Sequence, residues 1–171
     1  MLMKDLSDYC DRNKVREILN YAKTASRRDY LILKVLWESG MRVSELAALT
    51  PRDLEPQNHA IVSRNGKGNK AQRVYVDYKT GTMAMLYKYI SAMKIPEDAP
   101  IFGMKTNQLR NIVKKYGLHA GVNMHPHSFR HSFAINIVRQ GTDLRRVQQL
   151  LGHTNLNTTA VYLQFKDADI K

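Results

Sequence analysis

The side chains best suited to chemistry in this sequence are basic, and they stand in two short stretches. In the first, Arg42 precedes Glu45 by three residues, so on a helix the carboxylate can orient the guanidinium or form an ordinary surface ion pair with it. In the second, His127 precedes Arg130 by three residues at a predicted helix start, where both can face one anion. Solvent-exposed histidines at a helix start are the plainer interpretation, but they leave the arginine unexplained.

Zinc binding is the alternative chemistry for the second stretch. His127 and His131 are four residues apart, a spacing that presents two metal ligands on one helix face. No Cys, Asp or Glu lies within ten residues of the segment 125–131 to complete such a site. The sequence therefore predicts no metal site.

Two further candidates, His153 and Tyr162, stand toward the C-terminal end. Tyr162 follows His153 by nine residues, after a segment rich in helix-capping residues that predicts a turn into a last helix. Taken alone, this tyrosine is typical of a half-buried core residue.

A glycine-rich turn, residues 65–70, contains one more candidate, Lys67, which taken alone is an ordinary solvated lysine of a hairpin. The turn lacks the spacing and the following helix of a phosphate-binding NTPase loop. The sequence also contains no G-x-S-x-G elbow, no H-E-x-x-H motif and no paired-carboxylate arrangement. These absences exclude the corresponding nucleotidase, hydrolase and metalloprotease chemistries.

Helical periodicity dominates the elements that must position these residues. The segment 30–37 is apolar nearly all round and predicts a central buried helix that ends before Gly40. Two short β-type runs, 60–62 and 73–76, flank the glycine-rich turn and predict an antiparallel pair. Apolar stripes predict further helices within residues 15–22, 43–49, 83–90, 109–116, 133–138 and 144–151. The predicted fold class is mainly α with a small antiparallel β-sheet.

Composition limits the classes of partner. The chain has 171 residues and 19.7 kDa, which suits one compact domain, and its single Cys10 excludes an internal disulfide and fits a reducing compartment. Lys and Arg number 27 against 15 Asp and Glu, so the net charge is +12. This excess predicts a polyanionic partner, with nucleic acid ahead of a membrane surface. No apolar run is long enough to span a membrane.

Together these motifs resemble the catalytic domain of the tyrosine recombinase family, which includes phage integrases and Xer-like proteins. The resemblance extends from about Asp11 to Phe165 and implies the family's catalytic-domain fold. Five segments carry it in the family's order: 40–46 (GMRVSEL), 66–70 (GKGNK), 126–131 (PHSFRH), 150–153 (LLGH) and 158–162 (TTAVY). Each segment alone is a weak match, and it is their order and spacing that make the resemblance specific.

The resemblance implies a role for each matching residue. Tyr162 would attack a scissile DNA phosphate and form a 3′-phosphotyrosine with a free 5′-hydroxyl. Arg42 and Arg130 match the family arginines that hold the non-bridging oxygens, a role suited to a guanidinium that stays charged and donates paired hydrogen bonds. His153 matches a third phosphate-contacting residue, and Lys67 matches the lysine that protonates the leaving 5′-oxygen.

The other matches are supporting residues. The resemblance implies that His127 assists proton movement at the tyrosine or donates to the phosphate, and that Glu45 supports the active-site arginine. His131 fits the pattern as a structural residue rather than a catalytic one. A phosphotyrosine bond conserves the energy of the phosphodiester, so no metal and no nucleotide cofactor is implied.

Double-stranded DNA is the implied partner, with self-association on DNA into the family tetramer and no membrane contact. The expected location is the cytoplasm, in association with the nucleoid. From the basic clusters we expect four further DNA contacts: Lys70, Arg73, Arg145 and Arg146.

The sequence departs from the family pattern at both ends. We expect residues 1–171 to form a single catalytic domain, without the family's N-terminal core-binding domain and with a short tail after Tyr162. Such a chain is either a naturally minimal protein or the catalytic half of a longer one.

Two other functions remain open from the sequence. A type IB topoisomerase-like enzyme would use the same tyrosine chemistry to relax supercoils instead of exchanging strands. A non-catalytic DNA-binding module would use residues 143–162 as a helix-turn-helix. That module explains the net charge but leaves Arg42, Lys67, His127 and Arg130 without a role.

Overall fold

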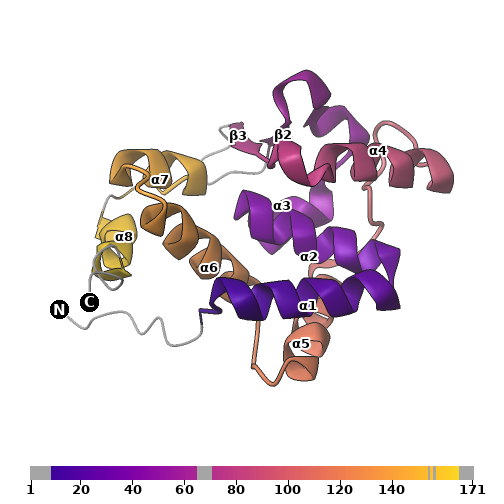
Figure 1. Ribbon diagram of the computed structural model, residues 1–171. Coiled ribbons are helices and arrows are strands. Elements are labelled where there is room, and N and C mark those ends of the chain that lie inside the picture. The colour runs from indigo at the N-terminus through magenta and orange to yellow at the C-terminus, as the bar shows by residue number, and fades with distance from the viewer. Residues whose placement is uncertain (1–8, 65–70, 154, 156, 166–171) are drawn as a thin grey trace.

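The computed structural model describes residues 9–64, 71–153, 155 and 157–165, and it is mainly helical with one small sheet (Figure 1). The predicted fold class is therefore confirmed. The α-helices are α1 (Arg12–Ala25), α2 (Arg27–Ser39), α3 (Val43–Ala48), α4 (Thr82–Met93), α5 (Thr106–His119), α6 (Pro126–Arg139), α7 (Leu144–Leu151) and α8 (Asn157–Ala160). Short 3₁₀ turns are η1 (Pro51–Asp53), η2 (Pro56–Asn58), η3 (Tyr78–Thr80) and η4 (Val161–Phe165).

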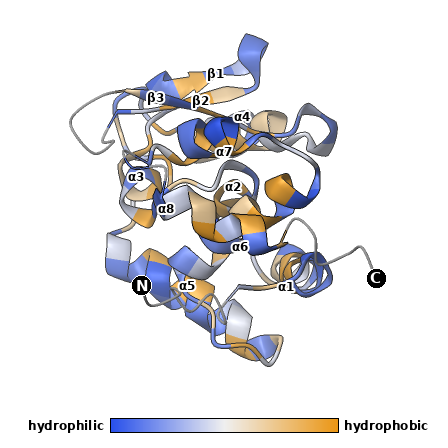
Figure 2. Ribbon diagram, turned by 90° about the vertical axis from the view of Figure 1, so that its left-hand side faces the viewer, coloured by the Kyte–Doolittle hydropathy of each residue, from blue (hydrophilic) through white to orange (hydrophobic). Residues whose placement is uncertain are grey.

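Helix α2 is the centre of the main core. Leu31, Ile32, Leu33 and Val35 are fully buried, because α1, α4, α5 and α6 all pack around this helix. Hydrophobic stretches of α2 and α6 accordingly lie in the middle of the molecule (Figure 2). The nearly continuous apolar run therefore correctly predicted a buried helix.

Helix α6 joins this core to a second, smaller one. Phe129 belongs to the main core, whereas Phe133 and Val138 pack with Val147 of α7 and with Tyr162 of η4. Arg130 and His131 thus lie on α6 at the seam between the two cores.

The sheet contains β1 (Leu54–Glu55), β2 (Ala60–Ser63) and β3 (Gln72–Tyr75), which pair antiparallel in the order β1-β2-β3. Ile61 pairs with Val74, and both side chains are buried. The antiparallel pair is therefore confirmed, while the two-residue strand β1 was not foreseen because so short a run carries no alternation. The turn at 65–70, with Lys67 and Lys70, lies outside the described residues.

The predicted last helix differs from the observed one. Helix α8 has only four residues, and the chain continues as the tighter 3₁₀ turn η4, which contains Tyr162. Tyr162 is thus held by its packing against α6, within the smaller core that α7 also joins, rather than by a long helix of its own.

Candidate active site

Arg130 is the buried centre of the site. It lies about one turn into α6, which begins at Pro126 and is capped by a hydrogen bond from the His125 N–H to Ser128 Oγ (3.2 Å). Only 6% of Arg130 is exposed. Its Nη1 donates to the Gly40 carbonyl (2.6 Å) and its Nη2 donates to the Leu151 carbonyl. The guanidinium therefore ties the C-terminal ends of α2 and α7 to α6.

No carboxylate is hydrogen-bonded to this buried guanidinium among the described residues. Burial, together with the neighbouring charge of Arg42, lowers the pKa of Arg130 to about 10. At neutral pH the side chain is still a cation. The Glu45 carboxylate is near enough to stabilise this charge in part, and a cation whose hydrogen bonds go to neutral carbonyls favours a further anion beside it.

Gly40 makes the Arg130 contact possible. Its φ of +61° is a left-handed conformation that L side chains rarely adopt, and a Cβ there would overlap the Phe133 ring. A glycine is therefore needed where α2 ends. The Gly40 carbonyl then accepts a hydrogen bond from Arg130, and the chain reaches Arg42 two residues later.

Arg42 is held by Glu45 at the start of α3. Glu45 accepts hydrogen bonds from the Arg42 backbone N–H (2.7 Å) and from Arg42 Nη1 (2.9 Å). The Glu45 side chain is only 3% exposed, against 29% for Arg42. Of the two interpretations open from sequence, an ordinary surface pair is therefore wrong, and the carboxylate orients the guanidinium.

A hollow of about 130 Å³ opens in front of the two arginines. It is lined by Arg42, Arg130, His127 and Arg110, together with Met41, Val43, Ser44 and Pro126. No acidic side chain lines it among the described residues. The hollow is therefore electropositive and suited to a phosphate, which accepts hydrogen bonds from several guanidinium groups at once.

Arg110 of α5 was missed from sequence, although its exposed position opposite the buried Leu109 stripe is a visible signal. It also lines a second hollow of about 290 Å³ that continues past His127 to Lys114, Asn123 and His125. This second hollow likewise has no acidic residue among the described residues that line it. Basic side chains thus extend from the arginine pair along α5.

Tyr162 is buried at 2% exposure, yet its hydroxyl faces polar groups. The hydroxyl oxygen lies 2.7 Å from His131 Nδ1. It is also close enough to Arg130 for the phenolate charge to raise the pKa of that arginine, against the larger lowering by burial. The tyrosine is thus more buried than a half-buried core residue, and its hydroxyl contacts the residue that follows Arg130 on α6.

His153 follows α7 after Gly152, whose φ of +59° ends that helix. Its Nδ1 lies 2.9 Å from Thr159 Oγ1 on α8. Arg130 binds the carbonyl of Leu151, which is two residues before His153. The guanidinium at the centre of the site therefore also fixes the chain that leads into His153.

Some of the residues predicted from sequence do not lie at the arginine site. Arg73 points to the sheet surface and pairs with Glu55 (2.8 Å), and this hydrogen bond raises the pKa of Arg73. Arg145 and Arg146 are exposed on α7, with Arg146 5.9 Å from the centre of the Tyr75 ring. Lys67 and Lys70 lie outside the described residues.

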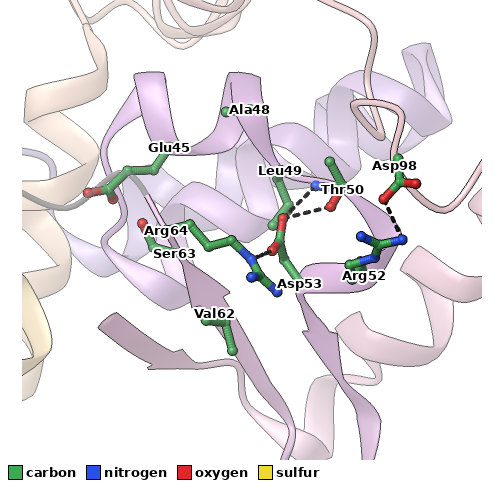
Figure 3. A pocket seen from close by; sticks show the side chains of 10 residues that line it. All are labelled: Glu45, Ala48, Leu49, Thr50, Arg52, Asp53, Val62, Ser63, Arg64 and Asp98. Atoms are coloured by element: carbon green, nitrogen blue, oxygen red, sulfur yellow. Dashed lines mark hydrogen bonds and ion pairs between the residues drawn. The ribbon is translucent and has the colours of Figure 1, made fainter. Parts of the chain in front are cut away.

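A third hollow, of about 270 Å³, lies between α3 and the sheet (Figure 3). Here the charges are already paired, because Arg64 bonds to Asp53 (2.5 Å) and Arg52 to Asp98 (2.7 Å). Burial alone would raise the pKa of Asp53, but hydrogen bonds from Arg64 and Thr50 outweigh it and hold that pKa below its usual value. This hollow is therefore less suited to an anion than the other two.

The described residues contain no group of three or more His, Cys, Asp or Glu placed to hold a metal ion. In the same part of the chain, no helix is both long and apolar enough to cross a bilayer.

Known proteins match this chain over nearly its whole length. The sequence profile of the phage integrase family matches residues 8–169. The tyrosine recombinase XerA of Thermococcus onnurineus is 36% identical over 167 residues, which make up 93% of this chain and 58% of that protein. The chain therefore spans little more than half the length of the curated relatives that it matches.

Solved structures share the fold. The crystal structure of XerA recombinase superposes with a TM-score of 0.80 at 28% identity, over 91% of this chain and 59% of that one. XerH site-specific recombinase, bound to its difH substrate before cleavage, also gives a TM-score of 0.80, over 100% of this chain and 56% of that one. Identity to XerH is 22%, so this second likeness bears on the fold alone.

Proposed function

The chain belongs to the phage integrase family, and from that premise we propose that it is the catalytic unit of a site-specific DNA recombinase. One observation carries the proposal. The hydroxyl of Tyr162 lies 2.7 Å from Nδ1 of His131, the residue after Arg130, and Arg130 together with Arg42 lines a hollow without acidic residues in the described part of the chain. A phosphate bound in that hollow would be held by a guanidinium whose neighbour in sequence contacts the tyrosine.

Tyr162 Oη would attack the scissile phosphorus in this mechanism. The new Oη–P bond forms as the P–O5′ bond breaks, leaving a 3′-phosphotyrosine and a 5′-hydroxyl. Arg42, Arg130 and His153 would stabilise the charge on the non-bridging oxygens, and Lys67 would give a proton to the leaving 5′-oxygen. Attack by the 5′-hydroxyl of another strand then reverses the step, so strands are exchanged and religated with no change in the number of phosphodiester bonds.

The proposal extends to partners and organisation. Double-stranded DNA would lie across the two hollows that have no acidic lining residue among the described residues, namely the one beside Arg42 and Arg130 and the one along α5; we call them the acid-free hollows. Arg110 and Lys114 are then added to the contacts expected from sequence. We propose that residues 1–171 act as one catalytic domain, that several copies assemble on DNA, and that the protein is found with the nucleoid. The helix-turn-helix module is less well supported, because α8 has four residues and is too short for a recognition helix.

Covalent trapping tests the proposal on a pool of DNA sequences, so the experiment does not depend on a chosen site. Nicked suicide duplexes from the pool are incubated with the protein, and the products are separated on denaturing gels. We expect a DNA-linked protein band with the wild type and none with Tyr162→Phe, and sequencing of the trapped DNA then defines a substrate. Tyr78→Phe is the matched control, because Tyr78 is 65% exposed and lines neither of the two hollows beside the arginines.

The same experiment separates the alternatives. No band despite salt-sensitive DNA binding would contradict the proposal in this chain and favour a binding module. A band accompanied by plasmid relaxation, without recombined products, would favour the topoisomerase-like enzyme.

A further inference from the structure

The C-terminal end of α7 is completed by side chains of two other elements. The carbonyls in the last turn of an α-helix have no partner within that helix. In α7 the carbonyls at positions 148 and 149 accept hydrogen bonds from the backbone N–H groups of His153 and Gly152, just after the helix. The carbonyls of Leu150 and Leu151 come last, so they need partners from elsewhere in the chain.

Gln72, the first residue of β3, binds one of these last carbonyls. Its side-chain Nε2 donates to the carbonyl of Leu150 (2.8 Å) and also to that of Gln149 (2.6 Å). The amide lies directly against the backbone that ends the helix, since a Cβ at Gly152 would overlap Gln72 Oε1. Gln72 therefore fixes the end of α7 to the sheet.

Arg130 binds the other one. Its Nη2 donates to the carbonyl of Leu151, while its Nη1 donates to that of Gly40. The acceptor of the buried guanidinium is thus the carbonyl next to the one that Gln72 binds. His153, which we propose to contact the phosphate, follows Leu151 by two residues. Because helix ends fray when their last turn is not held, loss of the Gln72 contact would displace both the acceptor of Arg130 and His153.

We propose that Gln72 is a positioning residue of this site; this rests on the function proposed above. By binding the end of α7 from the sheet, Gln72 holds the Leu151 carbonyl at Arg130. The same contact holds His153 beside the bound phosphate. Gln72 acts through these two residues, which would stabilise the charge on the non-bridging oxygens. It is not itself a catalytic residue.

The test measures the single-turnover rate of covalent complex formation at several concentrations of the DNA trapped by the wild type. Gln72→Met keeps the length of the side chain and removes its N–H donors. We expect the rate at saturating DNA to fall by about 10- to 100-fold, because a misplacement of about 1 Å can cost a factor of about 100. The DNA concentration that gives half of the maximal rate should not change. Gln57→Met, at an exposed position of η2, is the matched control and should behave as the wild type.

Gln72→Arg tests whether the donor is what matters. A guanidinium can bind two carbonyls, as Arg130 does, and a cation is favourable at the C-terminal end of a helix. We therefore expect Gln72→Arg to restore a saturating rate close to that of the wild type. A rate as low as that of Gln72→Met would overturn the proposal, because the contact would then not act through its hydrogen bonds.

A DNA substrate with sulfur in place of the scissile 5′-oxygen separates the phosphate-binding residues from the leaving-group side. A thiol has a pKa of about 8.5, so the thiolate leaves as the P–S5′ bond breaks without first taking a proton. We expect Gln72→Met to stay slow on this substrate, because the non-bridging oxygens still need Arg130 and His153. A wild-type rate would overturn the proposal, since Gln72 would then act through Lys67, five residues earlier in the chain.

NMR gives a readout that does not depend on activity. We expect the Nε–H signal of Arg130 and the amide signal of His153 to shift in Gln72→Met and to stay unchanged in Gln57→Met. If Gln72→Met does not fold, Gln72→Asn replaces it in every measurement, because its shorter amide cannot reach both carbonyls.

Three further results would overturn the proposal: unmoved NMR signals, a saturating rate of Gln72→Met within about threefold of the wild type, or a loss that comes entirely from weaker DNA binding. The last of these would make Gln72 a DNA contact. A wild type that forms no covalent complex is a different result, because it contradicts the proposed function, and the NMR comparison still tests the contact between Gln72 and α7.

Discussion

Arg42 and Arg130 differ in how far the fold depends on them. Arg130 is 6% exposed and satisfies two backbone carbonyls at the ends of α2 and α7. Arg42 has a side chain that is 29% exposed, and its partner is the Glu45 carboxylate. One arginine is therefore part of the protein interior, and the other is presented from its edge.

This difference predicts different effects of the same substitution. Arg130→Lys leaves a single ammonium that cannot bridge both carbonyls, so we expect a loss of about 2–4 kcal/mol in the free energy of unfolding. Arg42→Lys should cost less than about 1 kcal/mol, because its partner contact is partly exposed. Urea unfolding followed by the fluorescence of the single tryptophan, Trp37, measures both.

Both lysine variants should also lose covalent complex formation, since neither can donate paired hydrogen bonds to a phosphate. A stable Arg130→Lys protein with wild-type unfolding would show that the two carbonyls do not need the guanidinium. The structural part of this prediction would then be wrong, whatever the effect on cleavage.

At the scale of elements, local patterns predicted much of the fold. The 3.6-residue apolar stripes placed the helices, and the glycine-rich turn between two β-type runs correctly predicted the antiparallel pair. Local signals were too weak for the two-residue β1 and for the short α8 with its 3₁₀ extension. These elements depend on packing against distant segments, which periodicity does not record.

In the candidate site, too, local sequence spacing predicted some neighbours, whereas contacts between distant segments could not be predicted. Spacing within a motif correctly placed Arg42 with Glu45, and Arg130 near the start of α6. The partner of His131 comes from another element, since Tyr162 is 31 residues from His131 in sequence, and Arg110 of α5 shares its hollow with residues of α3 and α6. The resemblance implied a structural role for His131, and its contact with Tyr162 could be found only in three dimensions.

The junction of α2 and α3 can be tested through its glycine. Gly40→Ala places a Cβ into the Phe133 ring as well as in a left-handed conformation, so we expect a loss of about 2–4 kcal/mol in the free energy of unfolding. Gly81→Ala is the matched control, because Gly81 has a similar φ of +68° but nothing within 4 Å of the added carbon. It should cost only the backbone strain, about 1 kcal/mol.

The difference between the two variants isolates the overlap with Phe133, measured by urea unfolding under identical conditions. Equal losses would mean that the Phe133 ring moves away freely. In that case close packing at Gly40 would not be what fixes its carbonyl at Arg130.

At the scale of the whole molecule, the net charge is +12, and the balance of basic and acidic side chains differs between regions of the surface. Around the sheet, Arg64, Arg73 and Arg52 are paired with carboxylates. The two hollows beside Arg42 and along α5 have no acidic lining within the described ranges of the chain. Although Arg42 is itself paired with Glu45, basic side chains therefore line the two hollows without an acidic one among the described lining residues, where the proposed scissile phosphate and its neighbours would lie.

This asymmetry predicts how DNA affinity depends on salt. Each phosphate neutralised by a lysine or arginine releases condensed counterions, so the logarithm of the association constant falls linearly with the logarithm of the salt concentration. We expect a steep slope between about 50 and 200 mM salt. Lys114→Ala should make that slope shallower by about one, because Lys114 lines the second hollow. Fluorescence anisotropy with a labelled duplex measures the slope.

Lys115→Ala is the decisive control, because it removes the same charge from the next residue of α5. Lys115 is absent from the described lining of both hollows, and its Nζ lies over the Tyr116 ring, 4.9 Å from the centroid. If the DNA follows the acid-free hollows, the Lys115 variant keeps the wild-type slope while the Lys114 variant does not. Equal changes in the two variants would mean that α5 acts only through its overall charge, and the DNA path proposed along Arg110 and Lys114 would be wrong.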